Sequence, residues 1–128
     1  MKKKPILKKP KKKTVKNRLD KKWSLKVREV GECAINNKDC SQQLHPHHII
    51  GRRNTDTRWD LKNGICLCAI HHTLGKQSAH EDPLWFKEWL DENEPERMEY
   101  LNKKRKEPLH GTYSVEDYLK IEEETFDC

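Results

Sequence analysis

Cysteine and histidine side chains gather in the middle of this sequence with the spacing of metal ligands. Cys68 and His71 are three positions apart, and Cys33 and Cys40 precede them. Four thiolate and imidazole ligands suit a closed tetrahedral zinc site. The pattern therefore predicts one structural zinc ion bound by Cys33, Cys40, Cys68 and His71.

Cys66 is the alternative to Cys68, because residues two apart on a strand share a face. Only Cys68 has the tight spacing to His71, so we expect Cys66 to be a small buried hydrophobic residue. Cys33 and Cys40 are separated by six residues, where about two to four are usual. The spacing of Cys33 and Cys40 is therefore less typical of a zinc-ligand pair than that of Cys68 and His71.

Four further polar residues, His47, His48, Asn63 and His72, are not needed by the zinc ion. Adjacent strand residues point to opposite faces, so His47 and His48 are not expected to bind one ion from the same side. One can bind a metal while the other addresses a water molecule. His72 directly follows the last zinc ligand, and we expect it to join His47 around a second ion. Asn63 is placed to hold an imidazole by hydrogen bonding.

In this order, His48, Asn63 and His72 resemble the motif of the HNH endonucleases of the ββα-metal fold. Asn63 lies nine residues before His72, and the zinc ligands are the fifth and eighth residues after Asn63. The segments LHPHHIIGR, TRWDLKNGICLC and IHH look most like small HNH proteins encoded by bacteriophages and prophages. The resemblance covers roughly residues 30 to 90.

The resemblance implies phosphodiester hydrolysis with a single divalent cation, which is Mg, Mn, Ni or Zn. It makes His47 and His72 the ligands of this cation, His48 the general base, and Asn63 the residue that orients His48. Many relatives have another ligand one helical turn after the position of His72, where this chain has Lys76. Water or His80 is left to fill that third position.

Positive charge surrounds these residues. Arg52, Arg53 and Arg58 lie in the loop between the two expected strands, where bidentate phosphate contacts would suit a hydrolytic site; a solvated charged loop is the alternative. Residues 1–22 hold twelve Lys or Arg and one acid, a net charge of +11 within a total of +6. With two prolines and few apolar residues, residues 1–19 are expected to be a disordered arm that binds phosphates without reading sequence.

The elements that must position these side chains form an α+β chain with a small zinc-stapled ββα-metal core and flanking helices. We expect a helix from Asp20 to Gly31, strands at 44–50 and 64–68, and a helix starting at His72 that completes ββα. Further helices should begin at Pro83, after an Asp82 cap, at Pro95, and at Val115, after a capping box of Ser114 and Asp117. The domains are then the tail 1–19, the nuclease domain 20–93 and a helical extension 94–128.

Composition excludes several classes. With 33% hydrophobic and 38% charged residues in 128, the chain supports one small core that a structural metal would help to fold. There is no secretory signal or long apolar run, and the cysteines suit a reducing compartment. We expect a cytoplasmic protein, in the host cell cytoplasm if it is phage-encoded, with no membrane contact. No nucleotide-binding glycine motif or Ser-His-Asp arrangement is present.

These features predict a metal-dependent DNA endonuclease of phage recombination, packaging or replication. The alternative is a non-catalytic zinc-finger module that binds DNA or assists recombination. Asn63 and the second histidine of the adjacent pair discriminate, since a purely structural zinc site requires neither. A third hypothesis is an interaction protein with a phage or host partner, bound through the acidic C-terminal helix. That helix could instead fold back on the basic N-terminal segment.

Overall fold

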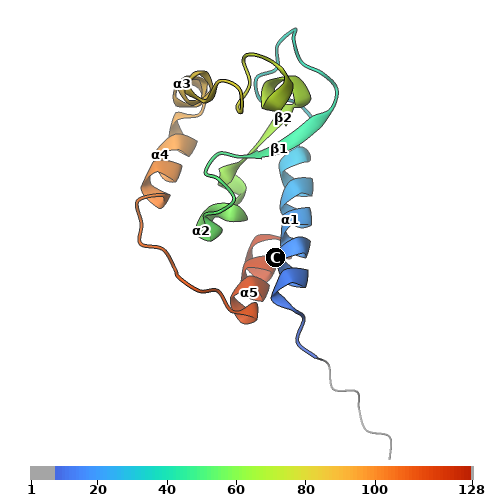
Figure 1. Cartoon of the computed structure of the whole chain (residues 1–128), viewed down its shortest axis with the longest axis vertical. Coiled ribbons are helices and arrows are strands. Elements are labelled where there is room, and N and C mark those ends of the chain that lie inside the picture. Colours follow the sequence, from blue (N-terminus) through green and yellow to red (C-terminus); the bar gives the residue numbers. More distant parts are fainter. Residues whose placement is uncertain (1–7, 128) are drawn as a thin grey trace, which may run out of the picture.

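The computed structural model describes residues 8–127, which form an α+β structure around a two-stranded sheet (Figure 1). In chain order the elements are α1 (Lys12–Arg28), β1 (Leu44–His48), α2 (Thr55–Arg58), the 3-10 helix η1 (Leu61–Asn63), β2 (Gly64–Cys68), the π-helix η2 (Ile70–Leu74), α3 (Pro83–Asn93), α4 (Pro95–Lys104) and α5 (Val115–Thr125). Among the described residues, no helix is long and apolar enough to cross a membrane.

The sheet pairs β1 and β2 antiparallel, with Leu44 opposite Cys68 and His48 opposite Gly64. Every residue of β2 is buried, whereas β1 is half-buried throughout. Ile65 and Leu67 pack into a core cluster with α3 and α4, and Cys66 packs into a second cluster with α1. The sheet therefore separates two small cores, and side chains that alternate along a strand enter different surroundings.

Helix α1 begins earlier than the sequence pattern predicted. Val15, Leu19, Trp23 and Val27 follow one another at four-residue intervals and are all buried, which is the spacing of one helix face. The expectation of disorder is therefore wrong for residues 12–19, because their two apolar side chains complete the core on this side of the sheet. The predicted arm at residues 1–7 lies outside the described residues.

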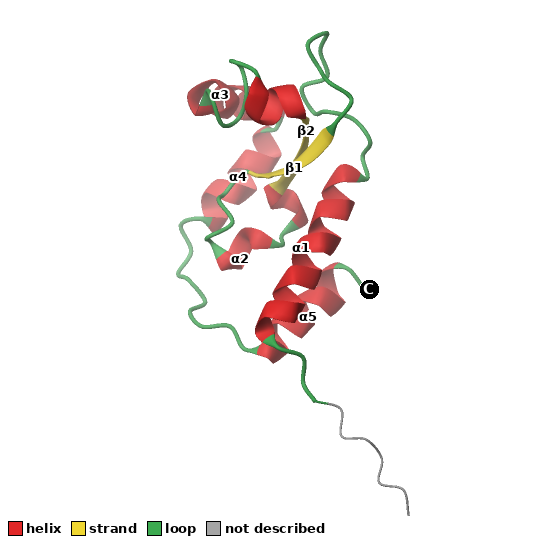
Figure 2. Cartoon of the chain, turned by 45° about the vertical axis from the view of Figure 1, so that its right-hand side comes forward, coloured by secondary structure: helices red, strands yellow, loops and turns green. Residues whose placement is uncertain are grey.

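The acidic helix α5 lies beside α1 (Figures 1 and 2). Arg18 donates two hydrogen bonds to the carboxylate of Glu122, at 2.6 and 2.8 Å, and Lys22 contacts Glu122 and Asp127 at 3.1 and 2.8 Å. The hydrogen bonds from Arg18 lower the pKa of Glu122 against the effect of its burial. The expectation that the acidic segment folds back on the basic one is confirmed for these residues.

The capping signals read from the sequence are confirmed. The side chain of Asp82 accepts a hydrogen bond from the Trp85 amide at 3.1 Å, with Pro83 in the first turn of α3. Ser114 and Asp117 form a reciprocal capping box at the start of α5. Such caps satisfy amides that the first helical turn leaves without partners.

The helix after β2 is shorter than expected for ββα. The chain makes a single π turn, closed by a hydrogen bond of 2.8 Å from the Gly75 amide to the Ile70 carbonyl. It then leaves helical geometry until Pro83. The expected helix starting at His72 is thus reduced to part of this turn, and the α+β class is the level at which the fold prediction holds.

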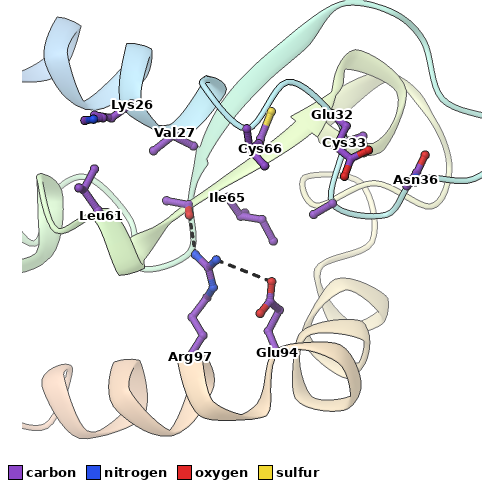
Figure 3. A pocket seen from close by; sticks show the side chains of 13 residues that line it. Lys26, Val27, Glu32, Cys33, Asn36, Leu61, Ile65, Cys66, Glu94 and Arg97 are labelled. Atoms are coloured by element: carbon purple, nitrogen blue, oxygen red, sulfur yellow. Dashed lines mark hydrogen bonds and ion pairs between the residues drawn. The ribbon is translucent and has the colours of Figure 1, made fainter.

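Helices α1 and α4 fix the start of β2 from two sides. Arg97 of α4 donates to the carbonyls of Gly64 at 2.6 Å and Lys62 at 3.1 Å, beside a cavity of about 440 Å³ between α1, β2 and α4 (Figure 3). A Cβ atom on Gly64 would lie 2.3 Å from a Val27 methyl group. Glycine is required there because α1 approaches so closely.

Candidate metal centres

Cys33, Cys40, Cys68 and His71 converge as the sequence predicted, and could hold a metal ion. Their sulfur atoms lie 3.7, 3.4 and 3.2 Å respectively from Nδ1 of His71. Bond lengths of about 2.3 Å for Zn–S and about 2.0 Å for Zn–N, at tetrahedral angles, place sulfur and nitrogen about 3.6 Å apart. The three distances from sulfur to Nδ1 are thus close to those of a tetrahedral site, and all four ligand atoms lie within 4.8 Å of one another.

The loop from Cys33 to Cys40 accommodates the wide spacing of the first ligand pair. The amide of Ala34 donates to the Cys66 carbonyl at 2.8 Å, which ties Cys33 to the edge of β2. Asn36 has a φ of 47°, a left-handed conformation that asparagine tolerates well. The intervening residues turn the chain back, so the second cysteine reaches the same point. Cys66 lies in the other core cluster and outside the group of four.

The thiols of this group differ in acidity. Burial raises the pKa of Cys68, but hydrogen bonds from the backbone amides of His71 and Ser41 outweigh it and bring the pKa to about 6. Burial raises the pKa of Cys40 to about 11. Metal binding requires thiolates and releases their protons. The surroundings of Cys68 therefore favour the thiolate that an ion needs, whereas those of Cys40 favour the thiol.

His47, His72 and His80 form a second group, with one ligand atom from each lying within 4.8 Å of the others. They come from β1, from η2 and from the loop before α3. The loop folds back onto the π turn, because the amides of Ala79 and His80 bond to the carbonyls of His71 and His72 at 2.8 and 3.2 Å. His80 therefore lies close enough to His47 and His72 to be the third ligand, a position for which the sequence allowed either His80 or water. Lys76 is exposed.

His45 is a fourth imidazole at this group, and sequence reasoning missed it. Its Nδ1 lies 3.0 Å from Nδ1 of His72. The two-residue period of the strand could have predicted this contact, because it puts His45 and His47 on one face. When Nδ1 of His72 donates a hydrogen bond to Nδ1 of His45, the His72 ring is held in place and its Nε2 carries the lone pair that a metal ion needs.

Burial and crowding favour the neutral imidazoles of His47 and His72. Burial, together with the neighbouring His72, His80 and His48, lowers the pKa of His47 to about 3. Burial, with His80 and His45 nearby, lowers the pKa of His72 to about 4. Because a neutral imidazole carries the lone pair that a metal needs, both residues are ready to act as ligands at neutral pH.

His48 lies on the opposite face of β1 from His47 and packs against α1. Its ring stacks on Trp23, with centroids 3.7 Å apart and planes 7° from parallel, and its Nε2 donates to the Arg58 carbonyl at 2.8 Å. Burial lowers the pKa of His48 despite that hydrogen bond. The ring is thus neutral and held in place, and Nδ1 carries the lone pair.

Asn63 does not make the contact that the sequence suggested. Its side chain is fully buried and bonds to the backbone N–H and C=O of Ile50, at 2.6 and 2.9 Å, and to the Thr57 carbonyl at 3.1 Å. Among the described residues it makes no hydrogen bond to His48. Asn63 instead closes the loop between the strands, whose Arg58 carbonyl holds the His48 ring.

The three arginines of that loop have different surroundings. Arg58 forms two hydrogen bonds with Asp20, at 3.0 and 2.6 Å, and its side chain is only 12% exposed. Arg58 is therefore not available as a surface contact for phosphate, contrary to the prediction. It connects the loop to α1 instead. Arg52 touches the same carboxylate at 3.4 Å but is 65% exposed, and Arg53 is exposed.

Comparisons with protein-family models, with curated proteins and with solved structures found no match for this chain.

Proposed function

We propose that this protein is a metal-dependent DNA endonuclease with a structural zinc ion at Cys33, Cys40, Cys68 and His71. The observation that carries the proposal is the convergence of His47, His72 and His80 on one face of β1, with the imidazole of His48 held on the other face, outside both ligand groups. A structural zinc site explains the cysteines alone. Three clustered imidazoles, of which His80 is exposed to solvent, and a fourth in a fixed orientation are parts that a hydrolytic site can use.

The three histidines fit a divalent transition metal ion by their chemistry. Imidazole nitrogen suits Zn, Ni and related ions, whereas Mg prefers oxygen ligands. An ion bound there would supply positive charge to the phosphate oxygens and to the departing oxygen. His45 keeps the His72 ring in position, and the protein leaves part of the coordination sphere to water and substrate.

His48 provides the general base in this mechanism. Its Nε2–H is held by the Arg58 carbonyl, so Nδ1 is the atom that accepts a proton from the attacking water. Stacking on Trp23 prevents ring rotation. The low pKa keeps the base unprotonated at neutral pH. Asn63 supports this arrangement indirectly by closing the loop that carries Arg58.

Positive charge supports DNA as the substrate. The chain has a formal net charge of +6, and Arg52 and Arg53 are exposed in the loop that follows β1. Phosphate contacts of this type bind DNA without reading sequence. Incubation of the zinc-loaded protein with supercoiled plasmid, branched DNA and single strands, each with Mg, Mn, Ni or Zn, tests the proposal. We expect cleavage with Ni or Zn to exceed that with Mg.

A zinc-stabilised DNA-binding module is the second candidate. It is favoured by the completeness of the three-cysteine, one-histidine group, which needs nothing from His47 or His48. Stacking of His48 on Trp23 is also compatible with a purely structural role. Binding of DNA without cleavage under all four metal ions would make this candidate the better account.

A further inference from the structure

A cavity of about 450 Å³ opens directly beside the histidines, and both His47 and His48 line it. Its other walls come from α3, from α4 and from residues 49–51 at the end of β1. Cavities of this size commonly take small organic groups. The cavity therefore continues the candidate hydrolytic site rather than forming a separate one.

The two helices present matching faces to this cavity. Pro83, Phe86, Lys87 and Leu90 line it from α3, and Met98, Leu101, Asn102 and Arg105 line it from the α4 side. Each set has the i, i+3, i+4, i+7 spacing of one helix face. Phe86, Leu90, Met98 and Leu101 are buried and form the floor, whereas Pro83, Lys87 and Arg105 are exposed at the rim.

The polarity of this cavity is complementary to that of a nucleotide. A base is flat and largely apolar on its faces, and Phe86, Leu90, Met98 and Leu101 supply a floor of that character. Asn102 accepts a hydrogen bond from Arg105 at 3.1 Å through its side-chain oxygen, which leaves its amide hydrogens for the edge of a base. Arg105 is exposed at the rim, where it can contact a flanking phosphate, and Lys87, which pairs with Asp91 at 2.7 Å, lines the cavity from α3.

We propose that this cavity binds one nucleotide base that has left its stack, so that the preferred substrate is DNA with an unpaired nucleotide. The inference rests on the proposed function, because the histidines at one end of the cavity would then act on the adjoining phosphodiester. A base inside a duplex cannot reach such a cavity. An unpaired nucleotide enters without the free energy needed to break a base pair.

Binding of three DNA hairpins tests the inference independently of cleavage. One hairpin carries a single bulged nucleotide, one carries an abasic residue at that position, and one is fully paired. Affinity is measured by fluorescence anisotropy with the full chain carrying one zinc ion and with no added Mg, Mn, Ni or Zn. We expect the bulged base to bind about tenfold more tightly than its abasic counterpart, as base contacts of this kind commonly contribute. Equal affinities for these two hairpins would overturn the inference.

Two matched pairs of variants place the effect in the cavity. Asn102→Trp fills the rim from a half-buried position, whereas Glu99→Trp adds the same side chain at an exposed position outside the cavity. We expect only Asn102→Trp to abolish the preference for the bulged base. Arg105→Ala should weaken binding of the bulged hairpin more than Lys103→Ala, although both remove one positive charge. Equal behaviour within both pairs would exclude this cavity as the site of base binding.

Cleavage assays on the same hairpins separate this inference from the proposed function. If the protein cuts bulged, abasic and paired hairpins equally well, it is a nuclease and the base-binding cavity is wrong. If it cuts none of them but still binds the bulged hairpin more tightly, the cavity binds a base as inferred and the proposed nuclease function is wrong.

Discussion

At the scale of single residues, β1 gives two adjacent histidines opposite surroundings. His47 faces α3 and joins His72 and His80, while His48 faces α1 and stacks on Trp23. Strand alternation alone was sufficient to predict this division from the sequence. In the proposed mechanism, metal binding and proton transfer therefore fall to two neighbouring imidazoles that do not compete for one ion.

The choice between Cys68 and Cys66 is tested by removing each thiol. Cys68→Ser should lose the zinc ion and unfold the small domain, because metal affinity and folding are coupled. Cys66→Ser replaces a buried residue outside the ligand group and should keep one zinc ion per chain. Metal analysis with circular dichroism measures both. Full zinc content in Cys68→Ser would refute the ligand assignment.

The third ligand of the second group is tested by a similar pair. His80→Ala should weaken Ni binding at this group while zinc content is retained, because His80 belongs only to the histidine group. Lys76→Ala, at the exposed position where relatives of the suggested family have a ligand, should leave Ni binding unchanged. Calorimetric titration of the zinc-loaded protein provides the measurement. Equal Ni affinity in both variants would remove His80 from the ligand set.

At the scale of secondary-structure elements, α1 is a helix whose first half is difficult to predict because it is rich in lysine. The lysines of residues 12–22 dominate the composition, yet Val15 and Leu19 continue the four-residue spacing of Trp23 and Val27. The average polarity of this basic segment predicts disorder. The four-residue spacing of its apolar residues predicts a helix, and the helix forms. Burial of two apolar residues in a core shared with α5 outweighs the charge repulsion.

Leu19→Ala should destabilise the protein by about 2–5 kcal/mol, the cost commonly found when a fully buried leucine is truncated. Leu19 is 0% exposed, whereas Leu25 in the same helix is 61% exposed. Leu25→Ala is therefore the control and should change the free energy of unfolding by well under 1 kcal/mol. Urea unfolding measures both. Similar values for the two variants would mean that α1 does not pack as described.

Local patterns account for the features that the sequence predicted correctly. The Cys68 and His71 spacing, the Asp82 and Ser114 caps and the bounds of β2 all depend on residues close in the chain. The features that were missed depend on contacts between distant segments. Asn63 binds the loop backbone instead of a ring, and Arg58 pairs with Asp20 of α1 across 38 residues. No local pattern specifies which distant partner such a polar side chain finds.

At the scale of the whole molecule, α1 connects the site to the acidic C-terminal helix. Its Asp20 holds Arg58 and also accepts from the Trp59 indole at 2.8 Å, while its Arg18 holds Glu122. A deletion of residues 1–20 would therefore remove part of the fold, so it cannot test whether the N-terminal segment binds DNA. A deletion ending at Lys11 leaves α1 intact and should lower the salt dependence of DNA binding.

Asp20 should make stability sensitive to acid. Burial raises its pKa, but hydrogen bonds from Arg58 and Trp59 outweigh this effect and hold the pKa below 3.8. A carboxyl group with a lowered folded-state pKa stabilises the protein above its unfolded-state value, and this contribution is lost as pH falls through the folded-state pKa. Asp20→Asn should therefore be less stable than the parent at pH 7, with the difference shrinking below pH 3.8. A difference independent of pH would contradict this role.

The central claim, that the histidines form a hydrolytic site, is tested most directly by the cleavage rate of His48→Ala against that of the parent. The rate should be measured with saturating DNA and Ni, under conditions where chemistry is limiting. A general base commonly contributes about 10²–10⁴-fold, so the variant should lose at least about a hundredfold in rate while it keeps its zinc ion, its fold and its affinity for fully paired DNA. His110→Ala, an exposed histidine outside both ligand groups, should cut as fast as the parent. A His48→Ala protein that cuts DNA at the parental rate would contradict the account.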